Sequence, residues 1–327
     1  MISRRTFLNA VAGGALAPLA AEGQEPTRVW RIGFLGAGSY SSGDPRVEAL
    51  RRGLRELGYA EGRNLAIEFR WAEGHSNRLP ALAAELATLK IDAIVSQGTQ
   101  ATDAARRAAT TIPIVFAVAG DPIGTGLVTS LARPGGNVTG LTDIAPEMAG
   151  KRLALLREVA PSITRIAVLW NPSNPSAAPQ MKDTSAVARS FALPIRSLEL
   201  KDVSQLESAF ATAVQDRAGA VIVLSDGALY GRRAQIAMLA AKHRLPCVAW
   251  TPEFAESGCL MTYGANVVEM HRRAAMFVDK IWRGAKPADL PIEQPTKFDL
   301  AINLKTAKAL GLSIPPSLLQ RADQVIE

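Results

Sequence analysis

Short apolar runs alternate along this chain with longer segments in which apolar residues recur every three or four positions. Residues 31–35 form a β-rich run that ends in a polar, glycine-containing loop at 36–43. Asp44 and Pro45 then begin a helical pattern that continues to Gly58, since Asp is a favoured helix N-cap and Pro a favoured first-turn residue. A strand, a polar loop and an amphipathic helix in this order predict an α/β fold.

The rest of the first half continues this alternation. The run at 112–119 is almost continuously apolar rather than alternating, which is typical of a strand buried on both faces and hence of a parallel sheet. The pattern predicts strands at 65–70, 93–96 and 114–118, and helices at 79–90 and 101–110.

A second series of elements begins near Arg165 and repeats the first. Three of its strands match strands of the first half in the same order and at nearly the same spacing. We therefore predict two similar α/β lobes rather than one long sheet. The matched runs are 165–169 with 31–35, 220–224 with 93–95, and 245–248 with 112–115.

The loops that follow the strands are the expected ligand-binding positions. Open parallel sheets bind ligands beyond the carboxyl ends of their strands, where helix N-termini also point. If the two lobes face each other, their loops line one cleft. The six loops are polar and contain Gly or Pro: 36–42, 97–100, 120–122, 171–174, 225–227 and 251–253.

Composition narrows the classes of function. Of the 327 residues, 48% are apolar and 20% charged, which is typical of a folded chain, and the length favours two domains over one. The net charge of +7 suggests a nucleic-acid partner, but the basic residues are dispersed and no recognition motif is present. We therefore expect no nucleic-acid partner.

Sequence motifs of catalysis and metal binding are absent: there is no P-loop, no G-x-S-x-G, no H-E-x-x-H and no C-x-x-C. Residues 36–41 approach the dinucleotide fingerprint but lack its third glycine and its acidic partner. His75, His243 and His271 lie on unrelated segments, so each is expected at the surface or at a helix end. We expect no enzyme activity, no metal and no cofactor.

The N-terminus has the three parts of an export signal. Arg4 and Arg5 precede Phe-Leu, a modest apolar stretch and small residues, which predicts a twin-arginine signal peptide at 1–23. The mature protein is then expected to be soluble and periplasmic. An oxidising compartment permits a bridge between Cys247 and Cys259, and two buried free thiols fit the sequence equally well.

Many short motifs of the chain match one family in order. The sequence resembles the exported substrate-binding proteins of ABC transporters, in particular the group whose better-known members bind tryptophan or tyrosine. The matching segments cover essentially the whole chain: 31–35, 53–59, 78–83, 111–116, 120–122, 133–140, 166–169, 171–172, 294–298, 303–307 and 310–311.

The resemblance implies the type I periplasmic-binding-protein fold, in which two Rossmann-like parallel-sheet lobes enclose a ligand cleft. It implies a division into lobe one, 28–143 plus 258–291, and lobe two, 144–257 plus 292–327. It also implies a function: a monomer that captures a small molecule, such as an aromatic or other amino acid, and delivers it to an ABC permease and ATPase.

Within the loops, an amino-acid ligand needs donors for its carboxylate and an acceptor for its ammonium. Thr99 and Gln100 at a helix N-terminus suit the carboxylate, and Thr99 also suits plain N-capping. Asp121 or Asp226 suits the ammonium, although both also suit turns. The remaining candidate ligand-binding residues are Ser39, Tyr40, Asn171 and Tyr263.

Three rival functions remain open from the sequence. The first is a ligand sensor of the same fold that signals to a membrane receptor. A transcriptional regulator is disfavoured because a signal peptide occupies the place of its helix-turn-helix. The last is a hydrolase that uses a cleft carboxylate such as Asp226. The sequence does not identify the ligand.

Overall fold

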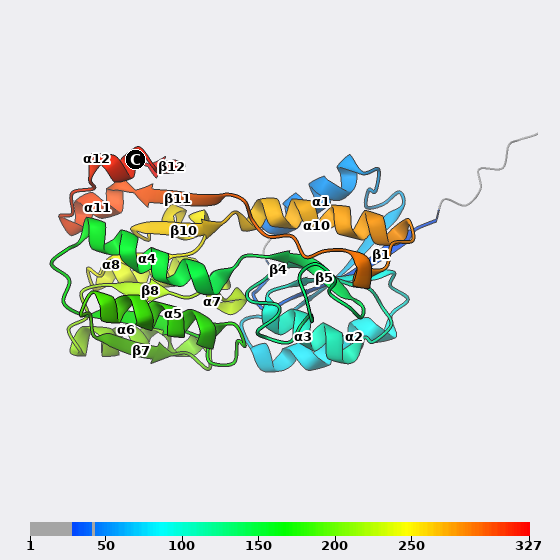
Figure 1. Ribbon diagram of the computed structural model, residues 1–327, viewed down its shortest axis with the longest axis horizontal. Coiled ribbons are helices and arrows are strands. Elements are labelled where there is room, and N and C mark those ends of the chain that lie inside the picture. Colours follow the sequence, from blue (N-terminus) through cyan, green and yellow to red (C-terminus); the bar gives the residue numbers. More distant parts are fainter. Residues whose placement is uncertain (1–27, 41–42) are drawn as a thin grey trace, which may run out of the picture.

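Two α/β lobes lie end to end along the long axis of the molecule, each built around its own sheet (Figure 1). The structure is a computed structural model that describes residues 28–40 and 43–327. The expected signal peptide at 1–23 lies outside the described residues. No helix in the described part of the chain is long and apolar enough to cross a membrane.

The sheet of the first lobe has five parallel strands in the order β2-β1-β3-β4-β5. Its central strands are buried on both faces, as the apolar runs of β1, β3 and β4 predict, whereas the edge strand β2 is partly exposed. The strands are β1 (Trp30–Gly36), β2 (Leu65–Trp71), β3 (Ala93–Gln97), β4 (Ile114–Ala119) and β5 (Val138–Thr142). The helices packed on it are α1 (Pro45–Glu56), α2 (Leu79–Thr88), α3 (Thr99–Ala108) and α10 (Val267–Trp282), with 3-10 turns at η1 (Ser76–Arg78) and η3 (Pro287–Asp289).

The sheet of the second lobe has seven strands in the order β12-β11-β10-β9-β8-β6-β7, all parallel except the pair β10–β11. The strands are β6 (Ile166–Trp170), β7 (Ile195–Glu199), β8 (Val221–Val223), β9 (Cys247–Ala249), β10 (Met261–Ala265), β11 (Phe298–Asn303) and β12 (Gln324–Ile326). The helices are α4 (Ala145–Val159), α5 (Ala177–Ser190), α6 (Leu206–Gln215), α7 (Gly227–Gly231), α8 (Arg233–Lys242), α9 (Pro252–Glu256), α11 (Leu304–Leu310) and α12 (Pro316–Leu319), with a 3-10 turn at η2 (Val203–Gln205).

Side chains of alternate residues in each central strand pack into separate hydrophobic cores on the two faces of the sheet. In β1, Ile32 and Phe34 pack with α1 and α10, while Leu35 packs with α2 and α3. In β6, Ala167 and Leu169 share a core with α6 and α8. The prediction of two similar lobes is therefore confirmed, and the carboxyl ends of both sets of parallel strands point toward the junction between them.

One assignment in the expected division differs from the structure. Residues 258–265 were expected in lobe one, but β10 pairs with β9 and β11 in the second sheet. The chain enters lobe one only after Ala265, where α10 begins. The segment up to Glu293 still contacts lobe one, through a bridge from Glu293 to Leu141. The expected division came from the family resemblance, which placed the return to lobe one before β10 rather than after it.

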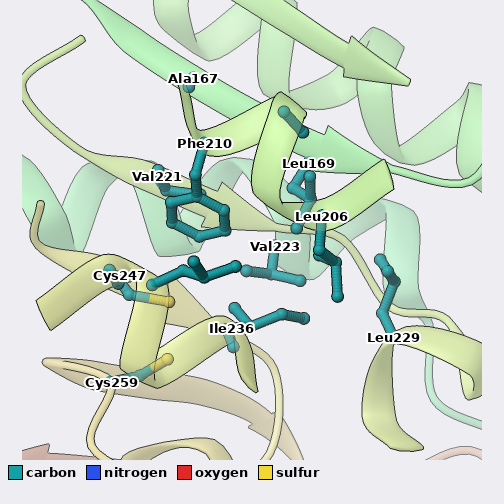
Figure 2. Close-up of a cluster of buried hydrophobic side chains, with 14 of the residues drawn as sticks. Ala167, Leu169, Leu206, Phe210, Val221, Val223, Leu229, Ile236, Cys247 and Cys259 are labelled. Atoms are coloured by element: carbon teal, nitrogen blue, oxygen red, sulfur yellow. The ribbon is translucent and has the colours of Figure 1, made fainter. Parts of the chain in front are cut away.

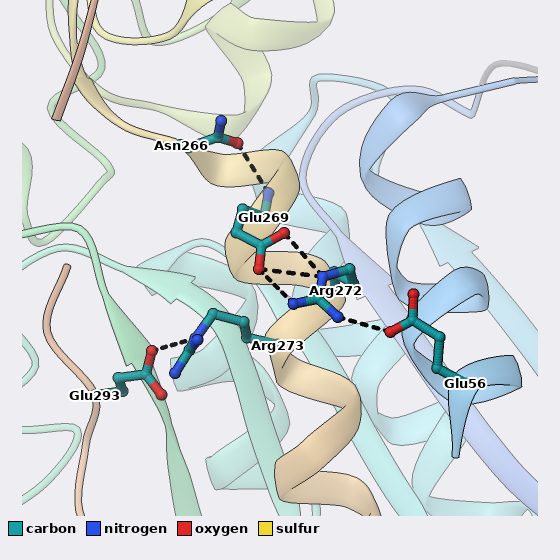
Figure 3. A network of polar contacts seen from close by, with 6 residues as sticks. All are labelled: Glu56, Asn266, Glu269, Arg272, Arg273 and Glu293. Atoms are coloured by element: carbon teal, nitrogen blue, oxygen red, sulfur yellow. Dashed lines mark hydrogen bonds and ion pairs between the residues drawn. The ribbon is translucent and has the colours of Figure 1, made fainter. Parts of the chain in front are cut away.

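Helix α10 completes lobe one from more than 200 residues away in the sequence. The Asn266 side chain caps it by accepting a hydrogen bond from Glu269 N. Arg272 pairs with Glu269 on its own helix and with Glu56 of α1, and Arg273 pairs with Glu293 (Figure 3). The ion pairs are largely exposed, so apolar burial between α1 and α10 is the main stabilising term.

Both cysteines are free and buried in the same core cluster of lobe two (Figure 2). Cys247 lies in β9 and Cys259 shortly before β10, and burial raises the pKa of the Cys259 thiol well above its usual range. The side chains pack with Phe210 and Ile236 as small apolar groups.

The close approach of α1 and α10 generates a stability prediction. A Cβ at Gly53 would lie 2.3 Å from the backbone oxygen of Arg272, so Gly53→Ala should separate the two helices and destabilise the fold by about 1–3 kcal/mol. An exposed helical Gly→Ala change would instead stabilise by up to about 1 kcal/mol. Urea denaturation gives the sign, and the exposed Arg55→Ala on α1 is the control.

Candidate functional site

A small cavity lies between the lobes. Four of the six predicted loops contribute to its lining; among described residues, 36–40 and 251–253 contribute none. From lobe one it is lined by Arg46, Gln97, Gly98, Thr99, Val118, Ala119, Gly120, Asp143, Val267 and His271. From lobe two it is lined by Asn174, Ser176, Ser225, Asp226, Gly227, Tyr230 and Trp250.

The strand order of lobe one sets the order of its groups along the cavity. Arg46 follows β1, Thr99 follows β3, Gly120 follows β4 and Asp143 follows β5. Neighbouring strands are about 4.8 Å apart. Arg46 and Asp143 therefore follow strands that lie three strand spacings apart in the sheet. Along this edge of the sheet, the N-terminus of α3 lies between the Arg46–Asp44 ion pair and Asp143.

The N-terminus of α3 is open toward the cavity. Its N-cap is Gly98, which has a φ of 90° and no side chain to bond the first N–H groups of the helix. The Thr99 hydroxyl does not cap the helix either, because it accepts from Gly120 N at 3.1 Å and donates to Gly120 O at 3.3 Å. Free N–H groups and the helix dipole together favour an anion here.

Asp143 supplies a buried carboxylate oxygen without a partner. Its Oδ2 accepts a hydrogen bond from Ser225 Oγ of the opposite lobe at 3.1 Å, while Oδ1 is buried and has no hydrogen-bond partner among the described residues. Burial raises the pKa of this carboxyl, although the charge of Arg152 and the Ser225 bond favour ionisation. A cationic ligand group at Oδ1 would complete the site.

Arg152 lies buried behind Asp143 at the crossing between the lobes. Its Nε donates to the backbone oxygen of Tyr263, in the middle of β10, at 2.8 Å. Burial lowers the pKa of the guanidinium to about 10, against the favourable charge of Asp143. Arg152 thus joins α4 to β10 within lobe two and places a buried positive charge near Asp143.

Arg46 reaches the cavity from the first turn of α1. Its Nε and Nη2 donate to both oxygens of Asp44, and Nη1 faces the side-chain amide of Gln97. Burial opposes ionisation of Asp44, but the bonds with Arg46 outweigh it and lower the pKa of that carboxyl. The guanidinium also lies 3.6 Å from the ring centroid of Tyr230, a cation–π contact from lobe one to lobe two.

Other contacts hold the lobes together at the rim of the cavity. His75 Nδ1 lies 3.0 Å from a carboxylate oxygen of Asp202. At Gly38, a Cβ would lie 3.0 Å from the backbone oxygen of Gly227, so only glycine allows the first loop to approach α7 this closely. The molecule is therefore in a closed arrangement, with the cavity covered from both sides.

His271 is fully buried in α10 and lines the cavity. Its Nδ1 lies 2.6 Å from the Val267 backbone oxygen, which can only accept, so Nδ1 carries the proton. Burial, together with the charge of Arg46, lowers the pKa of His271 to about 4. The imidazole is neutral near pH 7, with Nε2 as an acceptor.

Asp226, the favoured candidate acceptor for an ammonium group, has all its bonds satisfied within lobe two. Its Oδ1 accepts from the backbone N–H groups of Ala228 and Leu229 and so caps α7. Its Oδ2 accepts from Asn171 and Asn174 at 3.2 and 3.0 Å. The carboxylate organises the loops of lobe two and keeps no free lone pair for a ligand in this arrangement.

The other predicted residues lie at varying distances from the cavity. Thr99 and Asp226 line it, and Asn171 supports Asp226. The remaining candidates are absent from its lining: Ser39; Tyr40, half exposed beside Phe69 and Trp71; Gln100, bonded to Ser76; Asp121, closing a turn with Gly124; and Tyr263, packed on Phe298.

Sequence reasoning did not single out several of the lining residues. Asp143 follows β5, whose two threonines and one glycine gave no apolar run, so no strand was predicted there and no strand-end loop was assigned. Arg46 lies two residues after the recognised cap, Asp44. The expectation that His271 lies at the surface or at a helix end is wrong, because the packing of α10 against α1 buries it completely. The lining residues that were not named as candidates include Gln97 and Ser225, which lie in predicted loops, and also Arg46, Asp143, Ser176, Tyr230, Trp250 and His271.

The buried imidazole generates a pH prediction. Because the pKa of His271 is near 4 when folded and near 6.5 when unfolded, the unfolded state binds the proton first as pH falls. Stability is retained above pH 6.5 and falls between 6.5 and 4, by about 3 kcal/mol from this group. Urea denaturation across this range should show a smaller fall in His271→Gln; equal falls would contradict the assignment.

Comparison with known proteins gives a consistent result. The family model described as ABC transporter substrate binding protein matches residues 39–326. The chain is similar to the tyrosine-binding protein of Clostridioides difficile (strain R20291), with 25% identity over 281 residues, covering 86% of this chain and 81% of that protein.

Solved structures agree with this match. A conserved domain protein from Vibrio cholerae O1 biovar eltor is similar with 26% identity and a TM-score of 0.85, covering 91% of this chain and 100% of that one. An ABC domain from Streptococcus pneumoniae in complex with L-Trp has 26% identity and a TM-score of 0.83, with the same coverage. A leucine-binding protein from Thermotoga maritima, 14% identical with a TM-score of 0.58 over 86% of this chain and 87% of that one, shares the fold.

The fold is thus the type I periplasmic-binding-protein fold expected from the sequence. The family model spans most of the chain, and its matched segment contains every residue that lines the cavity. This protein belongs to the family of ABC transporter substrate-binding proteins.

Proposed function

We propose that this protein binds a free aromatic amino acid between its lobes and serves as the solute-binding component of an ABC importer. The observation that carries the proposal is the unpartnered, buried Oδ1 of Asp143 beside the open N-terminus of α3. An acceptor for a cation and a set of donors for an anion, in one closed cavity, match the two charged groups of an amino acid.

The ammonium is assigned to Asp143 and the carboxylate to the N–H groups at Thr99 and the residues after it. Arg46 does not alter this assignment, because its charge is already paired with the Asp44 carboxylate. Burial raises the pKa of Asp143, and a bound ammonium would restore its ionised form. Ligand and protein charges would then neutralise each other away from water.

The aromatic part of the ligand is assigned to Tyr230 and Trp250. Both rings are buried and line the cavity, and Trp250 is fixed by Phe254 at 4.5 Å between ring centroids. Aromatic pairs add about 0.5–1.5 kcal/mol to the burial of their area. One similar protein is named as tyrosine-binding and another was solved with L-Trp, which supports the same ligand class.

Delivery to a membrane permease and ATPase follows from the family and completes the proposal. In such a system the protein acts outside the cytoplasm, as a monomer without catalysis, and residues 1–23 would be its twin-arginine export signal. A ligand sensor would use the same cavity, and no feature of the described residues favours that alternative.

The ammonium assignment is tested by calorimetric titration of the purified protein with L-Trp, L-Tyr and L-Phe. Asp143→Asn should weaken binding by roughly 10- to 100-fold, because a charge-assisted hydrogen bond is lost in a buried site. Asp121→Asn is the matched control, since Asp121 lies outside the cavity lining and should leave binding unchanged. Tryptamine and indole-3-propionate, each lacking one charged group, should bind more weakly than L-Trp.

Two results would contradict the proposal. If none of the three amino acids gives binding heat or a thermal shift, the ligand class is wrong. If Asp143→Asn binds L-Trp as tightly as the unchanged protein does, the ammonium lies elsewhere.

A further inference from the structure

We propose that His271 is a specificity-determining residue whose Nε2 accepts a hydrogen bond from a ring N–H or O–H of the bound ligand. The cavity would then prefer indole and phenol side chains to a phenyl side chain. This inference rests on the proposed function, because it requires an aromatic amino acid in the cavity.

The first support is the fixed tautomer of His271. The Val267 oxygen, 2.6 Å from Nδ1, holds the ring proton on that nitrogen and leaves a lone pair on Nε2. Both residues lie on the first turns of α10, so a helical spacing of four fixes the orientation of the ring. The packed helix therefore holds the imidazole in one orientation at the wall of the cavity.

The second support is the missing partner of that acceptor. Nε2 is buried and bonds to none of the described residues, although His271 is fully enclosed and lines the cavity. Buried polar atoms normally find a partner, so an unsatisfied one needs an explanation. A donor on the ligand would supply the bond.

The charges around His271 indicate which group of the ligand donates the hydrogen bond to Nε2. Arg46 and Asp44 of the α1 N-terminus face the ring, and Arg46 helps to lower its pKa. Protonation is therefore disfavoured, so His271 does not attract the ligand carboxylate. The charges of Arg46 and Asp44 balance each other, whereas Asp143, at the opposite end of the lobe-one edge, offers an unpaired oxygen to an ammonium. A neutral ring donor is the ligand group that fits.

Tyr230 supports the same assignment from the opposite lobe. Its hydroxyl is also buried without a hydrogen-bond partner among the described residues, and its ring lines the cavity beneath Arg46. Two unsatisfied polar atoms thus belong to cavity-lining residues, one from each lobe, at a surface otherwise suited to an aromatic ring. Such a site penalises a ligand that leaves them unpaired.

The experiment compares ligands that differ only in the ring donor, by calorimetric titration of the purified protein. The pairs are L-Trp with 3-benzothienyl-L-alanine, in which sulfur replaces the ring N–H, and L-Tyr with L-Phe. The unchanged protein should prefer the donor-bearing member of each pair by roughly 10- to 100-fold. In His271→Leu these preferences should fall to within about threefold, with the affinity for L-Phe retained.

His271→Gln is the conservative variant, because its amide oxygen keeps an acceptor and should retain part of the preference. Equal affinities within each pair for the unchanged protein would overturn the inference, as would preferences that persist in His271→Leu. In either case tight binding of L-Phe would leave the proposed function standing. Failure of all the amino acids to bind would overturn the proposed function and this inference together. The ligand pairs on the unchanged protein need no variant, so a folding defect in His271→Leu does not prevent the test.

Discussion

The need to cover both faces of each parallel sheet shapes this molecule. The first sheet is buried on both sides, and α1 occupies only part of the face on which Ile32 and Phe34 lie. Helix α10, more than 200 residues later, fills the rest of that face. The chain must therefore cross between the lobes and return. These crossings carry Asp143 and the residues beside it, and α10 brings His271 into the cavity.

The chemistry of the cavity depends on which polar atoms the fold leaves unused. Asp226 has four hydrogen bonds within lobe two and stiffens that wall. Asp143 Oδ1, Tyr230 Oη and His271 Nε2 have none among the described residues, although each is buried. Buried polar atoms without hydrogen-bond partners cost stability. The hydrogen-bonded groups of the cavity wall hold these few atoms in fixed positions, and so form a preorganised binding surface.

Much of the fold could be predicted from the sequence, and less of the site. Parallel strands such as β4 are identifiable because burial on both faces makes them continuously apolar. The open N-terminus of α3 was identifiable from Gly98 and Thr99. The sequence does not show which of Asp226 and Asp143 has a free carboxylate oxygen. That depends on whether Asn171 and Asn174 donate hydrogen bonds to Asp226. Likewise, the burial of His271 depends on α1, which is distant in the sequence.

A crystal structure of the protein with L-Trp tests the account most directly. The account predicts the ligand ammonium at about 3 Å from Asp143 Oδ1, the carboxylate at the N–H groups of the α3 N-terminus, and the ring between Tyr230 and Trp250. A ligand whose ammonium is held by other residues, with Asp143 Oδ1 still unpaired, would contradict it.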